Sequence, residues 1–264
     1  MVVENETGSI IQVDQLPNDP FAMPPPYWRS SGAAFHIVDA LEEIIHLFEE
    51  LVPVHEETEM QIHEFFERHP HENLTEDENE EFANICDELE EIEIRIKLRA
   101  EIAVLMSAIQ MEDDLNRFCV YNLHKNIAES IEKLSSPEKL LIATTMVAQQ
   151  DVKGDRVYDA VRKLSSWRNA FAHGHCTDRP TKSLRHNHLI NPEEYPGVPS
   201  VIAEVKELVG GYIQVTDHLR SISKNPYMAG RSSEVEQMRE HIKEIGYYRF
   251  VGNNTVYNIE IEGL

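Results

Sequence analysis

Apolar residues recur at helical spacing through most of this chain, and that period constrains the fold more than any other feature. From Ala34 to Val52 the apolar positions step by 4, 3, 4, 3 and 4 residues, with acidic residues between them. The same alternation of 4 and 3 runs from Val201 to Ile222. Such a repeat places apolar side chains on one face of an α-helix. The sequence therefore predicts a mainly α-helical protein.

Prolines mark where the first helices are expected to end. Pro53 should end the helix that begins near Ala34, and a short helix should then run to about His69, before Pro70. The Glu-rich segment Leu74–Leu123 is expected to form one very long helix or two with a bend. A segment with so much Glu on its outer face is typical of an antiparallel helical hairpin or a coiled-coil-like arm.

Helix-start and turn signals divide the second half of the chain. Ser135 to Glu138 has the residues of a helix start, with Ser as N-cap and Pro in the first turn. Gly154-Asp155 should restart a helix, and a last helix should span about Arg231–Ile245. The alternating tail around Gly252-Asn253-Asn254 predicts a small β-hairpin.

These signals divide the chain into four expected parts. Residues 1–30 read as an extended Pro-rich arm, and residues 31–93 as an acidic helical extension. Residues 94–224 should form an antiparallel helical bundle, followed by a C-terminal helix and the β-hairpin over 225–264.

Charge is distributed very unevenly along the 264 residues. The 47 acidic and 24 basic residues give a formal net charge of −23, which at first argues against a nucleic-acid ligand. Residues 1–114 hold 29 of the acids and 5 of the bases, whereas residues 115–189 hold 12 bases and 7 acids. A polyanion is therefore not excluded as a ligand of the second half.

The cellular setting is expected to be the cytoplasm. A membrane span needs about 18 or more consecutive apolar residues, and the sequence has no such run. The first residues lack the basic and apolar regions of a signal peptide. Three cysteines without CxxC spacing fit a reducing compartment better than a disulfide framework.

Arg168 interrupts an apolar stripe. Extending the stripe of Val157, Val161 and Leu164 by four residues reaches Arg168, and a further three reaches Phe171. An inward-facing charge must be paired or functional, because leaving it unpaired costs several kcal/mol.

A carboxylate interrupts another stripe in the same way. The stripe of Leu98, Ile102, Leu105 and Ile109 continues to Glu112. An inward Glu and an inward Arg are natural partners in one bundle. Asp113 lies four residues beyond Ile109 and is the alternative partner. The pair either belongs to a functional site or only fixes the register of two helices.

The segment around Arg168 also holds a histidine. Gly174 is a natural residue to follow a helix end at His173, and Asn169 shares a face with His173, whose ring it can orient. An Arg that neutralises a phosphate, beside a His that titrates near neutrality, suits cleavage of a phosphodiester by a neighbouring hydroxyl.

Arg168-Asn169-x-x-x-His173, followed by Gly174, resembles the Arg-x4–6-His motif of HEPN domains, small α-helical bundles common in prokaryotic toxins and antiphage defence. The resemblance covers roughly Arg95–Lys224 and makes the expected fold a HEPN-like bundle. It implies a metal-independent endoribonuclease in which the RNA 2′-OH attacks its own phosphate. The products would be a 2′,3′-cyclic phosphate and a 5′-OH. It also implies a homodimer, with two motifs facing across a shared cleft, and no cofactor.

The resemblance assigns a role to each residue of the motif. Arg168 would bind the scissile phosphate, His173 would act as general base or acid, Asn169 would position His173, and Glu112 would hold Arg168. The candidate contacts to the RNA backbone, which otherwise form a solvated basic face, are Arg162, Lys163, Lys182 and Arg185.

Other readings remain open at this point. A catalytically silent HEPN scaffold would use the acidic extension for protein interaction, and an antitoxin that mimics nucleic acid would rest on the acidic first 114 residues. The histidines and cysteine between 173 and 188 do not have the spacing of a tetrahedral metal site, so no metal is expected. A protein partner that inhibits or triggers the enzyme is expected. We hypothesise that the acidic extension keeps RNA away from everything but the cleft, or occupies the cleft as a brake.

Overall fold

The computed structural model describes residues 2–4, 10–12, 32–70, 74–173, 197–223, 232–251 and 255–258. The described part of the chain forms seven helices and two antiparallel strand pairs, so the predicted mainly helical fold is confirmed. The helices are α1 (Ala33–Arg68), α2 (Glu76–Asn122), α3 (Lys125–Ile131), α4 (Ser136–Ala148), α5 (Arg156–His173), α6 (Val198–Ile222) and α7 (Ser232–Ile245). The strands are β1 (Val2–Glu4) with β2 (Ile10–Gln12), and β3 (Tyr248–Val251) with β4 (Thr255–Asn258).

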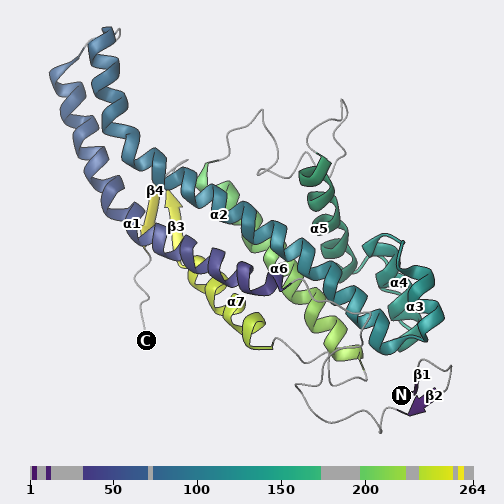
Figure 1. Ribbon diagram of the computed structural model, residues 1–264. Coiled ribbons are helices and arrows are strands. Elements are labelled where there is room, and N and C mark those ends of the chain that lie inside the picture. The colour runs from purple at the N-terminus through teal and green to yellow at the C-terminus, as the bar shows by residue number, and fades with distance from the viewer. Residues whose placement is uncertain are drawn as a thin grey trace, which may run out of the picture.

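α1 and α2 lie side by side, and their joined end projects beyond the other helices (Figure 1). Of the two alternatives for residues 74–123, the structure has the single long helix, which spans 47 residues. The prediction that Pro53 ends the first helix is wrong, because Pro53 lies inside the 36-residue α1. A proline inside a helix costs about 3 kcal/mol. Packing against α2 continues on both sides of it, with Leu51 and Phe65 fully buried, and offsets that cost.

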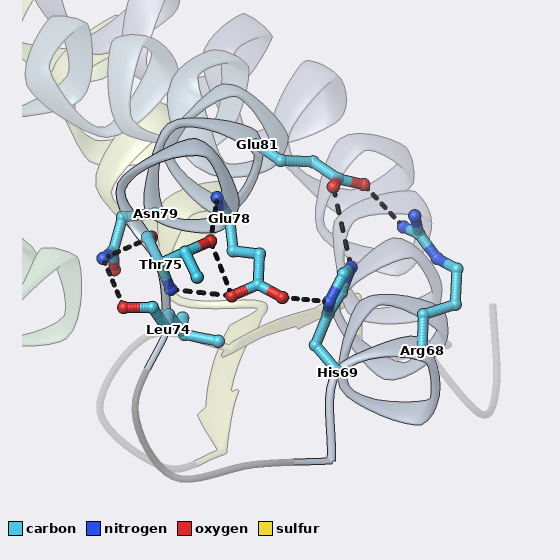
Figure 2. A network of polar contacts seen from close by, with 7 residues as sticks. All are labelled: Arg68, His69, Leu74, Thr75, Glu78, Asn79 and Glu81. Carbon is cyan, nitrogen blue, oxygen red and sulfur yellow. Dashed lines mark hydrogen bonds and ion pairs between the residues drawn. The ribbon is translucent and has the colours of Figure 1, made fainter.

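The projecting end, residues 53–93, is called the distal hairpin here. Polar contacts close its tip (Figure 2). His69 Nδ1 lies 2.6 Å from Glu78 Oε1, and Arg68 Nη2 lies 2.7 Å from Glu81 Oε1, so the end of α1 is tied to the start of α2. The same Glu78 accepts a hydrogen bond from the Thr75 amide at 2.7 Å and completes a capping box at the start of α2.

The helical part of the structure outside the distal hairpin, including α1 as far as Val52, is called the bundle here. A buried carboxylate fixes the register of three of its helices. Asp114 of α2 accepts hydrogen bonds from Gln110 Nε2 at 3.0 Å and from the Tyr212 hydroxyl of α6 at 3.1 Å. Gln110 Oε1 also accepts the Ala34 amide at 3.1 Å, in the first turn of α1. Because the carboxylate is hydrogen-bonded, its burial is compensated, and it links α1, α2 and α6.

The core face of α2 differs from the expected one. Leu98, which begins the predicted stripe to Ile109, is 53% exposed, and the rest of that stripe is only half-buried. The small residues Ala100, Ala103 and Ala108 of the buried face allow neighbouring helices to approach closely. The larger apolar residues of that face are Ile96, Val104, Met111, Leu115 and Phe118. Glu112 therefore lies at the edge of this buried face, next to Met111, rather than within it.

Other expectations agree with the structure. Ser135 is the N-cap of α4, and both its amide and its hydroxyl donate to Glu138 Oε2. These hydrogen bonds hold the pKa of the Glu138 carboxyl below its usual value. The apolar stripe of α6 is buried from Val201 to Leu219.

Several expected elements lie partly or wholly outside the described residues. They include the prolines and aromatic residues of 17–28 and the loop of 174–196. In the part of the chain that is described, no helix combines the length and the apolar character needed to cross a lipid bilayer.

Candidate functional site

Arg168 lies at the edge of the core. The buried line of α5 passes through Val161 and Leu164 to Trp167, all fully buried, so the step after Leu164 is three residues rather than the predicted four. The expectation that Arg168 occupies a core position is therefore wrong: 30% of its side chain is exposed. Phe171, predicted as the next core residue, is 45% exposed. This position lets one side of Arg168 face α2 while the other reaches solvent.

Two side chains hold the Arg168 guanidinium. Nη1 forms an ion pair with Glu112 Oε2 of α2, the carboxylate that the interrupted period pointed to, and Nη2 donates to Asn169 Oδ1 at 3.1 Å. Of the two carboxylates considered from the sequence, Glu112 is the one that contacts Arg168. Because both terminal nitrogens have partners, the guanidinium has a defined orientation with part of its surface open to solvent.

Lys139 of α4 is a third member of the cluster and was not predicted from the sequence. Only 4% of its side chain is exposed, and Nζ donates to Asn116 Oδ1 at 2.8 Å. Nζ also lies 3.9 Å from Glu112 Oε1, so one carboxylate faces two cations. Burial lowers the pKa of Lys139. The available signal was its spacing from the buried Ala143, which places a lysine on the inward face of α4.

Charge in this cluster favours an anionic ligand. With Lys139 protonated, Arg168, Lys139 and Glu112 together carry a net positive charge, and Arg168 is the member that carries it to the surface. The Glu132 carboxylate also acts on Lys139 and offsets part of that charge. An anion such as a phosphate oxygen would meet preoriented N–H donors there. The cluster therefore has the charge and the geometry to bind a phosphate at its solvent side.

Cys119 lies beside the cluster but has no nucleophilic character. Burial raises the pKa of its thiol to about 12, although the nearby Lys139 favours the thiolate. The thiol therefore stays protonated at neutral pH, and the side chain acts as a small apolar core residue.

The aromatic residues on either side of Arg168 form a stacked pair. The Trp167 and Phe171 rings are nearly parallel, with an interplanar angle of 11° and 5.3 Å between their centroids. Trp167 is fully buried, whereas Phe171 is 45% exposed. A flat apolar surface therefore lies one helical turn from the guanidinium.

His173 is the last residue of α5, and its side chain lies outside the described residues. The predicted contact between Asn169 and the His173 ring therefore stays a prediction, while the hydrogen bond described for Asn169 is the one with Arg168. Lys182 and Arg185 also lie outside the described residues. So do the other histidines and the cysteine that were weighed as metal ligands: His175, Cys176, His186 and His188. Within the described ranges, no group of three His, Cys, Asp or Glu residues could hold a metal ion.

Arg162 and Lys163 are the remaining candidates for contacts with the RNA backbone. Both side chains are exposed and already form ion pairs within the protein. Arg162 Nη2 lies 3.5 Å from Asp159 Oδ1, and Lys163 forms an ion pair with Glu207 of α6. Exposed ion pairs are worth about 0–1 kcal/mol. A polyanion can therefore displace these carboxylates at little cost.

Comparison with known proteins finds no relative of this chain. Neither the family models, nor the curated proteins, nor the solved structures gave a match to this chain. The case for a function therefore rests on the residues of the chain itself.

Proposed function

We propose that this protein is a metal-independent endoribonuclease of the HEPN type and that Arg168 binds the phosphate at which RNA is cleaved. The observation that carries the proposal is the partly exposed Arg168 side chain, whose guanidinium is held by Glu112 and Asn169 beside the buried Lys139. The motif Arg168-Asn169-x-x-x-His173 supplies a general base or acid on the same helix.

The reaction needs a base for the 2′-OH, an acid for the leaving 5′-oxygen and a group that stabilises the charged phosphate. The RNA 2′-oxygen attacks the adjacent phosphorus, the bond from phosphorus to the 5′-oxygen breaks, and a cyclic phosphate and a 5′-OH result. His173 would take the proton from the 2′-OH or give one to the leaving 5′-oxygen. Arg168 would stabilise the charge that develops on the non-bridging oxygens, a contribution of about 10²–10³-fold for one such donor.

Glu112 and Lys139 would act through Arg168 rather than on the RNA. Glu112 keeps the guanidinium in one orientation by its ion pair, which limits the entropy lost on phosphate binding. Lys139 faces the other oxygen of the same carboxylate and offsets part of its charge, so that Glu112 does not cancel the attraction of Arg168 for phosphate.

The proposal includes a homodimer with two facing motifs, and a toxin or phage-defence role controlled by a protein partner. Both parts rest on the resemblance. A strictly monomeric mass in solution would remove the shared cleft. Toxicity on expression that His173→Ala abolishes is expected for a toxin.

The decisive experiment incubates the pure protein with tRNA and mRNA, with and without EDTA. Arg168→Ala and His173→Ala should each lose cleavage, and the wild-type products should carry 2′,3′-cyclic phosphate and 5′-OH ends whether or not EDTA is present. Arg95→Ala is the matched control, because Arg95 is another partly exposed arginine of the chain, paired with Glu50 at 3.2 Å and with Glu43 at 3.6 Å. Cleavage that survives either of the first two substitutions would sink the assignment of the site.

One observation favours the alternative of a catalytically silent scaffold. Both terminal nitrogens of Arg168 have protein partners, as expected of an arginine that only joins α2 to α5. Wild-type protein that leaves RNA intact but forms a tight stoichiometric protein complex would support that alternative over the nuclease.

A further inference from the structure

The Phe171 ring is exposed in an unusual way. Single exposed apolar side chains are common and need no explanation by themselves. Phe171, however, lies nearly parallel to the fully buried Trp167, at 11° and 5.3 Å between centroids. The indole therefore supports Phe171 from the core side, and 45% of Phe171 remains open to solvent.

This support makes the exposed ring a rigid surface. Trp167 is among the largest fully buried side chains of the protein, so the core fixes its position. A phenylalanine stacked on it has little freedom to turn away. The contrast is Phe66 in the distal hairpin, which is 46% exposed but meets its neighbour Phe65 edge-on, at 83°.

The position of the ring indicates what it would bind. Phe171 follows Arg168 by three residues on α5, and side chains at that spacing are neighbours on one helical face. In a nucleotide, the base is joined to its phosphate through one ribose, so adjacent binding surfaces for a base and a phosphate match one nucleotide. The charge of this part of the sequence also fits, because residues 115–189 carry 12 bases against 7 acids.

We infer that Phe171, supported by Trp167, is a stacking platform for an unpaired nucleobase whose phosphate contacts Arg168. The inference rests on the proposed function and narrows its substrate to single-stranded RNA or loops, since a base inside a duplex cannot reach the ring. Stacking on an aromatic side chain accepts any base, so the platform contributes affinity and position with little sequence preference.

Binding tests the platform separately from cleavage. The probe is a labelled single-stranded RNA with 2′-O-methyl riboses, which cannot be cleaved by 2′-OH attack, together with the same backbone without bases. Phe171→Ala should weaken binding of the intact probe about 10-fold, within the range measured for base stacking on aromatic residues. Phe171→Leu should weaken it similarly because it keeps the volume but not the flat ring, and Phe171→Tyr should bind like wild type.

Two controls separate stacking from damage to the fold. Phe66→Ala removes an equally exposed ring from the distal hairpin and should leave binding unchanged. On the probe without bases, Phe171→Ala and wild type should bind alike. Equal binding of the intact probe by Phe171→Ala and wild type would overturn the platform, as would an equal loss on both probes.

The outcomes also distinguish the platform from the nuclease. If wild type cleaves RNA but Phe171→Ala binds the intact probe as wild type does, the platform fails and the proposed function stands. If wild type leaves RNA intact but binds the probe in a base-dependent way through Phe171, the platform stands and the nuclease fails. If wild type binds neither probe, both fail.

Discussion

The distal hairpin and the bundle are built on the same two helices, yet they bury different side chains. In the bundle, α1 buries large apolar residues: Ile37, Leu41, Ile44, Leu47 and Phe48. Beyond Pro53 the same helix buries only His55, Thr58 and Phe65, and the first buried residue of α2 is Ile92. Most helices of the bundle pack against several neighbours, whereas the two helices of the hairpin pack mainly against each other (Figure 1). Helical period alone therefore does not determine how deeply a face is buried.

Buried carboxylates show the same contrast. In the bundle, Asp114 accepts hydrogen bonds from Gln110, Tyr212 and Thr216. In the hairpin, Glu93 Oε1 is buried without a hydrogen-bond partner, and burial raises the pKa of Glu93 against the opposing effect of Lys97 at 3.7 Å. The bundle has a satisfied polar network that fixes its geometry, and such a framework is what a precise site requires.

The largest expected effect is on stability, from truncating a fully buried aromatic residue in each region. Trp167→Ala should lower the free energy of unfolding by about 3–5 kcal/mol, because it leaves a large cavity in the bundle core. Phe65→Ala removes an equally buried ring from the hairpin and should cost clearly less, because a two-helix segment opens locally before the whole protein unfolds. Urea denaturation gives both values. Equal losses would contradict the difference between the two regions.

Alkaline pH should destabilise the bundle through Cys119. Its thiol pKa is raised from 9.0 to about 12 in the folded protein, so the folded state binds more protons than the unfolded state between those values. Stability should therefore fall as pH rises from 9 towards 12, by at most about 1.4 kcal/mol per pH unit for one group.

The opposite shift at Lys139 must be separated from this effect. Its pKa is lowered from 10.5 by burial, so the unfolded state binds more protons below 10.5 and stability should rise with pH in that window. Cys119→Ala should therefore flatten the loss above pH 9, and Lys139→Met should steepen it. Cys86→Ala in the hairpin is the comparison: burial and the nearby Asp87 and Glu90 also raise the pKa of this half-buried thiol, so the substitution should flatten the loss as well, but by less than Cys119→Ala. A slope that Cys119→Ala leaves unchanged would contradict the burial of the thiol.

The coupling energy of an ion pair should also differ between the two regions, but by less than the effects above. Arg168 and Glu112 are each 30% exposed, whereas Arg68 and Glu81 at the hairpin tip are 56% and 41% exposed. A double-mutant cycle on the bundle pair should give a coupling of about 1 kcal/mol, and one on the hairpin pair about 0.2–0.5 kcal/mol with stronger weakening by salt. A larger coupling at the tip would reverse the comparison.

The smallest expected effect concerns the charge of the distal hairpin, which holds 16 acidic residues and one basic residue. If the hairpin repels RNA from surfaces other than the site, replacing exposed Glu56, Glu64, Glu80 and Glu91 by Gln should strengthen RNA binding a few-fold at low salt and not at high salt. Unchanged binding at low salt would remove that hypothesis. Deletion of residues 1–93 is a poor test, because it removes Ile37–Phe48 from the core.

The sequence predicted helices better than it predicted which side faces the core. The α6 stripe and the Ser135 cap follow from local chemistry and are confirmed. In α2 and α5 the predicted apolar faces are offset from the faces that are buried, which include Met111 and Trp167. Steps of three and four residues both fit a helical period, yet they differ by about 100° around the axis. Only neighbouring helices decide between them.

The cluster around Arg168 shows what local pattern could and could not find. Glu112 and Arg168 were predicted to meet because each interrupts an apolar stretch, and they do meet, but at the edge of the core. Lys139 was missed because its burial depends on Asn116 and Glu112 of another helix. Pro53 was misread because the packing of α1 on α2 outweighs its local preference. All three depend on contacts that are distant in sequence.

The central claim is that Arg168 stabilises the phosphate during RNA cleavage, and a single-turnover cleavage rate tests it most directly. With saturating protein and EDTA present, Arg168→Ala should cleave about 10²–10³-fold more slowly than wild type, while Arg95→Ala should cleave at the wild-type rate. Arg168→Lys should lie between them, because it keeps the charge but loses the two-pronged geometry. An Arg168→Ala rate equal to that of wild type would contradict the account.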